Sequence, residues 1–318
     1  MNNMHKLPLM IPLLMFLAVP AVALPSVNFT LLQLQVTMDR AGFSSGTIDG
    51  RMGANTRRAR GIYQKQGRGD QMAEPVTRYR ITPGDAAGPY VTIPSSMKRK
   101  ALLPALGYSS LLEAVAERFH TTPLFLRQLN PDAGFVEGDE ITVPNVVALV
   151  IPIGSSKVSA PALPEPLDSE ADTAWNALSA RPDSVVTVSK SRSLLTVTNA
   201  GGRVVFSAPV STGSRRDPLP LGGWKVNGLK FNPIYHYNPH LFWNAGIGDT
   251  RAKIPAGPNN PVGLVWIDIS KKHYGLHGTP EPALIGRTQS HGCVRLTNWD
   301  ALRLAAEVKP GTRVEFIP

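Results

Sequence analysis

Residues 185–206 read VVTVSKSRSLLTVTNAGGRVVF, a stretch with three short runs of β-branched and other apolar residues. The runs are Val185–Val188, Leu194–Val197 and Arg203–Phe206, and their composition and length are typical of strands. Asn199–Gly202 carries two glycines and supplies a hairpin turn between the last two runs. The stretch therefore predicts the beginning of a β-rich domain.

The chain downstream continues the same pattern. Val262–Ile269 and Arg313–Ile317 are further candidate strands, and Trp299–Val308 reads as one helix that a following Pro-Gly pair ends. Many short strands with one helix predict a mostly-β domain over residues 183–318, either β-sandwich-like or a mixed sheet. This region lacks the strand–helix alternation and the glycine motif of a dinucleotide-binding fold.

Residues 25–70 are predicted to form a small helical domain. Apolar residues at helical spacing indicate a first helix, which Gly42 ends as a C′ glycine, and Asn55 is a good N-cap for a second helix. Asp49-Gly50 supplies a turn between the two helices. The apolar positions of the first helix are Leu31, Leu32, Leu34, Val36 and Met38.

Residues 75–147 predict an α/β module. Tyr79–Thr82 alternates as a short strand, and Ile141–Val143 is a second strand that closes the module. Between them, Ser110–Glu113 forms a capping box at the start of one helix, and Pro123 begins another. The whole chain is therefore expected to be a multidomain α+β protein.

Residues 1–23 have the features of a secretory signal peptide. Leu7–Leu17 is an apolar run too short to span a bilayer, which takes about 20 residues, and Ala21–Ala23 is a small-residue cleavage site. We expect cleavage after Ala23 and no integral membrane segment in the mature chain, with an uncleaved anchor as the alternative. Residues 148–182 are rich in Pro, Ala and Ser and predict a semi-rigid linker.

The net charge of the chain is +10, which favours an acidic partner. Because export argues against nucleic acid as that partner, an anionic polymer or lipid surface of the cell envelope is the better match. Positive charge that only aids solubility is an equal alternative.

The only cysteine lies in the hexapeptide Ser290-His291-Gly292-Cys293-Val294-Arg295. A single thiol in an exported protein cannot form an internal disulfide, and its neighbours favour nucleophilic chemistry. A free thiol is only about a few per cent ionised at neutral pH and needs a base, for which His277 and His291 are both candidates. The amides of Gly292 and Cys293 are candidate oxyanion donors, and Arg295 suits a substrate carboxylate.

This segment resembles the catalytic domain of YkuD-type L,D-transpeptidases, and the likeness covers most of residues 183–318. Its most specific element is His277-Gly278-Thr279 followed by the cysteine hexapeptide. One difference is Leu219-Pro220-Leu221-Gly222, which stands where the family commonly has Thr-Pro-x-Gly. Further matching residues are Ser211-Thr212-Gly213, Asn260-Pro261, Gly263, Trp266, Gly286, Asn298 and Asp300.

The resemblance implies a periplasmic thiol enzyme that carbapenems acylate at Cys293. Cys293 would attack the carbonyl between a diaminopimelate-type L-centre and the terminal D-alanine of a peptidoglycan stem tetrapeptide, with His277 as base. The thioester would then pass to an amine of another stem peptide or of an envelope lipoprotein. In the remaining roles, the Gly278 carbonyl orients His277, Gly292 contributes an oxyanion amide, Ser290 and His291 shape the site, and Arg295 stabilises the motif or the substrate.

Both upstream modules resemble wall-binding domains. Residues 25–70 resemble a small peptidoglycan-binding helical repeat, and residues 75–147 resemble a LysM carbohydrate-binding module, so glycan is an expected partner. The second likeness is interrupted by an insertion between Asp85 and Ser109, which leaves a spacer role open. The matching segments are Leu34-Gln35, Ala41-Gly42-Phe43, Ile48-Asp49-Gly50, Tyr63-Gln64, Pro83-Gly84-Asp85, Val115–Phe119 and Leu129-Asn130-Pro131.

Three functions remain open on the sequence: an L,D-transpeptidase, an L,D-carboxypeptidase with water as acceptor, and a non-catalytic wall-binding scaffold. The first two need the same thiol and base, so the sequence does not separate them. No cofactor and no metal are expected. His236 and His240 have the spacing of helical metal ligands, but Pro239 argues against a helix there.

Overall fold

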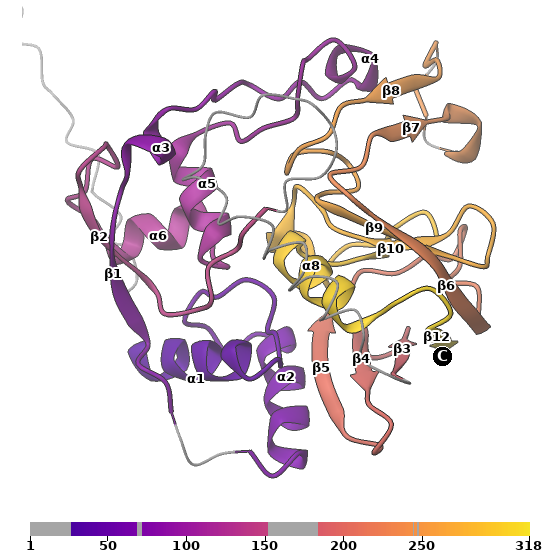
Figure 1. Cartoon of the computed structure of the whole chain (residues 1–318), viewed down its shortest axis with the longest axis horizontal. Coiled ribbons are helices and arrows are strands. Elements are labelled where there is room, and N and C mark those ends of the chain that lie inside the picture. Colours follow the sequence, from indigo (N-terminus) through magenta and orange to yellow (C-terminus); the bar gives the residue numbers. More distant parts are fainter. Residues whose placement is uncertain (1–26, 69–71, 152–183, 244, 247) are drawn as a thin grey trace, which may run out of the picture.

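The computed structural model describes residues 27–68, 72–151, 184–243, 245–246 and 248–318 (Figure 1). The predicted signal peptide and nearly all of the predicted linker lie outside these residues. Within the described residues, no helix has both the length and the apolar character that crossing a membrane requires.

The helical module consists of α1 (Phe29–Arg40) and α2 (Ala54–Lys65). Gly42 follows the end of α1 with a φ of +95°, the left-handed conformation expected of a C′ glycine. The prediction for the second helix is wrong in detail, because Gly53 rather than Asn55 is its N-cap. The side chain of Asn55 instead donates to the carbonyl of Ile285, 3.0 Å away in the C-terminal domain.

The α/β module has the predicted order of strand, helices and strand. Antiparallel β1 (Val76–Arg80) and β2 (Glu140–Pro144) flank four helices. At the Ser110 N-cap the hydroxyl accepts from the Glu113 amide, but the Glu113 carboxylate binds the amide of Ser109 rather than that of Ser110. The helices are α3 (Pro83–Ala86), α4 (Met97–Lys100), α5 (Leu111–Arg118) and α6 (Pro123–Leu129).

These two modules share one hydrophobic core. Leu32 and Val36 of α1 and Ile48 of the following loop are buried together with side chains of the α/β module, among them Phe119 and Ile141. Because each module buries apolar side chains of the other, separating them would expose that core to water. They are therefore packed as one body rather than as independent units.

The C-terminal domain is built on an eight-stranded sheet with the order β11-β10-β9-β6-β12-β3-β4-β5. Its pairs are antiparallel except for β12 with β3 and β10 with β11. The strands are β3 (Val185–Ser189), β4 (Leu194–Thr198), β5 (Val204–Pro209), β6 (Gly222–Phe231), β9 (Val265–Ile269), β10 (Gly275–His277), β11 (Val294–Arg295) and β12 (Arg313–Ile317).

Of the two arrangements expected, the topology is the mixed sheet rather than a pair of separate sheets, because the eight strands form one hydrogen-bonded series. The long strand β6 pairs with β12 through its first half and with β9 through its second half. The two ends of the series also meet, since Ser211, just after β5, exchanges backbone hydrogen bonds with Arg295 of β11. The sheet therefore curls, and α8 (Asn298–Glu307) packs against β9 and β10.

A second, two-stranded sheet pairs β7 (Tyr235–Tyr237) with β8 (Ala252–Ile254). The loop after β7 forms a short 3-10 helix, Pro239–Leu241. In Figure 1 this hairpin lies beside α4, away from the α1–α2 pair.

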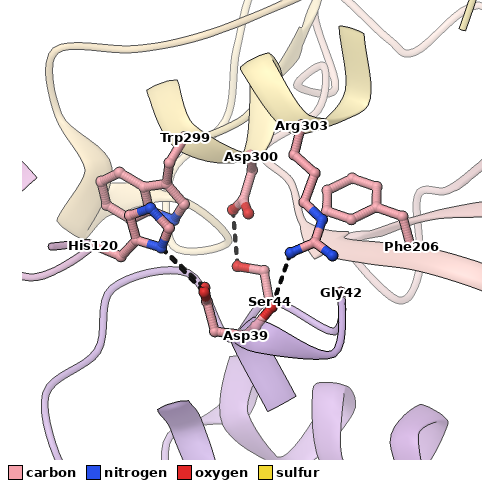
Figure 2. A pocket seen from close by; sticks show the side chains of 8 residues that line it. All are labelled: Asp39, Gly42, Ser44, His120, Phe206, Trp299, Asp300 and Arg303. Carbon is pink, nitrogen blue, oxygen red and sulfur yellow. Dashed lines mark hydrogen bonds and ion pairs between the residues drawn. The ribbon is translucent and has the colours of Figure 1, made fainter. Parts of the chain in front are cut away.

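The N-terminal modules meet the C-terminal domain at a polar junction (Figure 2). His120 stacks on Trp299 of α8, with ring centroids 5.1 Å apart, and its Nδ1 lies 3.2 Å from the Asp39 carboxylate. Ser44 donates to the buried carboxyl of Asp300 at 3.0 Å. Arg303 donates to the Asp39 carbonyl at 2.9 Å. The junction therefore joins α1, the α/β module and α8 through buried polar contacts.

Candidate active site

Cys293 sits in a tight turn directly before β11 and is partly buried. Gly292 has a φ of +108°, and a Cβ there would lie 2.6 Å from a ring carbon of Tyr274, so the turn needs glycine. Ser290 holds the turn from the other side, because its hydroxyl donates to the Cys293 carbonyl and accepts from the Gly292 amide. These contacts fix the position of the thiol.

His277 ends β10 and is the register partner of Arg295 on the parallel strand β11. Extending this register by one residue pair places Cys293 opposite Gly275. By this register, His277 lies two positions along β10 from the point opposite Cys293, which occupies the bend just before β11.

The hydrogen bonding of His277 selects its tautomer. Its Nδ1 lies 2.7 Å from the carbonyl oxygen of Gly278. A carbonyl only accepts, so Nδ1 carries the proton and Nε2 keeps a lone pair. The ring is buried and stacks on Trp266, with centroids 5.5 Å apart. The imidazole is thus held in one orientation with a basic nitrogen available.

The charges around the site keep both reacting groups neutral at rest. Burial, and then the positive charge of Arg295, lower the pKa of His277 to about 3. Burial raises the pKa of the Cys293 thiol, while a hydrogen bond from the Gly275 backbone and the charge of Arg295 act in the opposite direction. The favoured forms are therefore a neutral thiol and a neutral imidazole.

His291, the second candidate base, faces the β7–β8 side of the site. Its ring meets Phe242 edge-on at 5.0 Å and lies 5.8 Å from Trp243, by centroid distance. Burial lowers the pKa of His291, with Asp217 acting against that shift. Its surroundings are therefore those of a packed aromatic contact.

One of the two amides expected to donate to an oxyanion has a partner within the turn. The Gly292 N–H donates to the Ser290 hydroxyl at 3.2 Å. Arg295 lies where its charge acts on both the thiol and the imidazole, which is a broader role than holding a substrate carboxylate.

The site also contains two tyrosines, Tyr235 and Tyr274, that the motif did not identify. Burial, followed by the charge of Cys293, raises the pKa of both Tyr235 and Tyr274, which places both phenols near the thiol. Tyr274 lies three residues before His277, so its closeness in sequence was a usable signal. Tyr235 comes from β7, and only the tertiary fold brings it to Cys293.

The two histidines considered as metal ligands lie on different elements. His236 is an exposed residue of β7, and His240 belongs to the 3-10 helix that follows. Among the residues that the structure describes, no group of three or more His, Cys, Asp or Glu side chains is arranged to hold a metal ion.

Comparisons with known proteins find similarity over the C-terminal domain. The YkuD family model, described as the L,D-transpeptidase catalytic domain, matches residues 183–316. A Bacillus licheniformis protein assigned as an L,D-transpeptidase YkuD is 49% identical over 61 residues, which are 19% of this chain and 37% of that protein. The "Probable L,D-transpeptidase YbiS" of Escherichia coli K12 is 37% identical over 121 residues, 37% of this chain and 39% of that protein. The chain thus spans well under half the length of these two relatives.

Solved structures that match part of the chain include two mycobacterial L,D-transpeptidases. The enzyme from Mycobacterium smegmatis is 17% identical with a TM-score of 0.36, over 43% of this chain and 59% of that one. L,D-transpeptidase 3 of Mycobacterium tuberculosis, solved with a faropenem-derived adduct, is 20% identical with a TM-score of 0.35, over 43% and 61% of the two chains.

Proposed function

Since residues 183–316 match the family model of the L,D-transpeptidase catalytic domain, we propose that this protein is a peptidoglycan acyltransferase that uses Cys293 as nucleophile. The observation that carries the proposal is the geometry of His277. Its Nδ1 is committed to the Gly278 carbonyl, which leaves a basic Nε2 at the end of β10, and the only cysteine of the sequence directly precedes β11, the strand paired with β10.

In the first step, His277 Nε2 takes the thiol proton as the sulfur attacks the carbonyl carbon between the L-centre and the terminal D-alanine of a stem tetrapeptide. The developing oxyanion accepts a hydrogen bond from the backbone N–H of Cys293. When the C–N bond breaks, the imidazolium returns the proton to the leaving amine. The products are D-alanine and a thioester on Cys293.

In the second step, an amine of an acceptor attacks the thioester carbonyl, and His277 takes a proton from that amine. The sulfur leaves, regains a proton and regenerates the enzyme. We propose a second stem peptide or a lysine of an envelope lipoprotein as acceptor. With water in place of the amine, the same machinery would act as an L,D-carboxypeptidase.

The role proposed for Arg295 is electrostatic. Its charge lowers the pKa of both Cys293 and His277. For the thiol this favours the anionic sulfur that forms during attack. For the imidazole it keeps Nε2 unprotonated and ready to accept a proton.

The N-terminal modules are proposed to hold the enzyme on the peptidoglycan, in the periplasm after export. The proposal is supported by a set of basic side chains on the helical module, which suits an anionic polymer. The set is Arg51, Arg57, Arg58, Arg60, Lys65 and Arg68, of which all but Arg58 are exposed.

The test is incubation of the full protein with purified tetrapeptide muropeptides, followed by mass analysis of the products. We expect crosslinked dimers together with released D-alanine, and no product from the Cys293→Ala variant. Release of D-alanine without dimers would assign the carboxypeptidase instead. Unchanged muropeptides with the wild-type protein would contradict the enzyme assignment and leave the wall-binding scaffold.

A further inference from the structure

The insertion that interrupts the LysM likeness makes its own hydrophobic cluster with the β7–β8 hairpin. Leu106, Tyr237 of β7 and Ile254 of β8 are buried together. Partly buried apolar side chains from both sides surround them. From the insertion these are Ile93, Met97, Ala101 and Leu103, and from the hairpin region they are Tyr235, Phe242 and Ala252.

Backbone hydrogen bonds fasten the same contact. The Leu106 amide donates to the Ala256 carbonyl at 2.8 Å, and the Leu106 carbonyl accepts from the Asn259 amide at 3.0 Å. Gly257 passes so close to the insertion that an added Cβ would lie 2.2 Å from the Leu106 oxygen. The segment after β8 is therefore shaped to receive the insertion.

The hairpin leads from this contact to the thiol. Tyr237 stacks on Phe242 at 5.6 Å, and Phe242 meets His291 edge-on at 5.0 Å, two residues from Cys293. Tyr235 of the same strand lies near the sulfur, as the effect of Cys293 on the pKa of that phenol shows. The hairpin thus forms an aromatic wall beside the nucleophile, with the insertion behind it.

We propose that residues 91–108 are an intramolecular brace that fixes the β7–β8 hairpin as the peptide-binding wall of the thiol site. Leu106 and Met97 are its positioning residues. The brace explains why the module departs from the LysM pattern at this point: the extra residues pack behind the β7–β8 hairpin rather than against a sugar. The claim that the hairpin binds peptide rests on the function proposed above. The mechanical part, that residues 91–108 hold the hairpin in place, does not.

The chain offers a matched pair of variants. Leu106 is fully buried in the cluster, while Leu102, in the same segment, is 80% exposed. Leu106→Ala leaves a cavity behind the hairpin, and Leu102→Ala removes the same atoms from the surface. Met97→Ala truncates a partly buried side chain and repeats the test with a smaller perturbation. The amides of β3 and β4 report whether the main sheet stays folded.

The first readout is amide hydrogen exchange across residues 235–254, which needs no catalysis. We expect exchange in Leu106→Ala to be at least about tenfold faster in the hairpin and unchanged in β3 and β4. Leu102→Ala should match the wild type. Wild-type protection of the hairpin in both Leu106→Ala and Met97→Ala would overturn the brace, whatever the activity of the protein.

The second readout is transpeptidation of tetrapeptide muropeptides. A loosened wall should raise KM about tenfold while lowering kcat less, because peptide binding and not the thiol–imidazole pair is disturbed. Equal kinetics of Leu106→Ala and the wild type would contradict the binding role of the wall. A wild-type protein that leaves muropeptides unchanged would instead refute the proposed function, and the exchange result would still decide the mechanical part.

Discussion

Two buried histidines of this protein each stack on a tryptophan, and their Nδ1 partners set them apart. His277 stacks on Trp266 and directs Nδ1 at the Gly278 carbonyl. His120 stacks on Trp299 and directs Nδ1 at the Asp39 carboxylate. The Gly278 carbonyl only accepts, so it fixes the proton of His277 on Nδ1 and leaves Nε2 basic, whereas the contact of His120 with Asp39 joins the α/β module to α1 at the junction. The first arrangement suits proton transfer and the second suits structural bonding.

The largest contrast is expected from removing each histidine. His277→Ala should lower the rate of acylation by about 10³-fold or more, close to the loss in Cys293→Ala, because nucleophile and base act as a unit. His120→Ala should leave that rate within about twofold. Single-turnover acylation with a tetrapeptide measures both. A large rate loss in His120→Ala with the fold intact would remove the distinction.

For the free energy of unfolding we expect the opposite order, with a larger effect from replacing His120 than from replacing His277. His120→Ala leaves the buried Asp39 carboxylate without its partner and should lower the free energy of unfolding by about 3 kcal/mol. Chemical denaturation of the two single variants checks this, with Cys293→Ala as a control for substitution near the thiol. Equal stability of His120→Ala and the wild type would show that the junction pair contributes nothing.

The pH dependence of acylation tests the role of His277 as the base. Because burial and Arg295 lower the pKa of His277 to about 3, loss of the base by protonation should begin only well below pH 5. Arg295→Gln removes one cause of that shift, so the acid limb should move to higher pH. The kcat/KM profiles of both proteins measure this, and identical acid limbs would exclude the effect of Arg295.

A smaller pH effect is expected at the junction. Burial, followed by the charge of Asp39, raises the pKa of Asp300 to about 7. The protonated form is therefore favoured in the folded protein, and its stabilising effect is complete below about pH 4 and lost as the pH rises through about 7. Asp300→Asn should flatten this part of the stability profile. An unchanged profile in thermal unfolding from pH 5 to pH 8 would contradict the assignment.

The smallest effect is expected on the exposed basic face of the helical module. Arg60→Glu combined with Lys65→Glu should weaken binding to purified sacculi a few-fold, more at low salt than at high salt. Turnover of soluble muropeptides should not change. Sacculus pelleting assays measure the binding, and wild-type binding at low salt would argue against a targeting role for this face.

Local patterns predicted the elements well but not their partners. Gly42 ends α1 and Pro123 begins α6 as expected, because caps depend on neighbouring residues. Asn55 was misassigned as a cap because its true partner, the Ile285 carbonyl, lies in another domain. Strand alternation likewise does not say which strands pair, so the shared strand β6 and the meeting of Ser211 with Arg295 were not predictable.

The candidate active site was likewise only partly predictable from the sequence. The motif located Cys293, His277 and Gly278 because they lie in two short segments. Tyr235 lies outside both segments, and its place near the thiol depends on the β7–β8 hairpin and the insertion behind it. The contact between Glu117 of α5 and Asn298 of α8, at 2.8 Å, also joins regions that no local pattern relates.

The most direct test of the central claim is mass spectrometric mapping of the acyl-enzyme formed from a stem tetrapeptide. We predict that the acyl group is found on the peptide that contains Cys293 in the wild type, is absent in Cys293→Ala, and forms about 10³-fold more slowly in His277→Ala. Acylation at any other residue, or an unchanged rate in His277→Ala, would contradict the account.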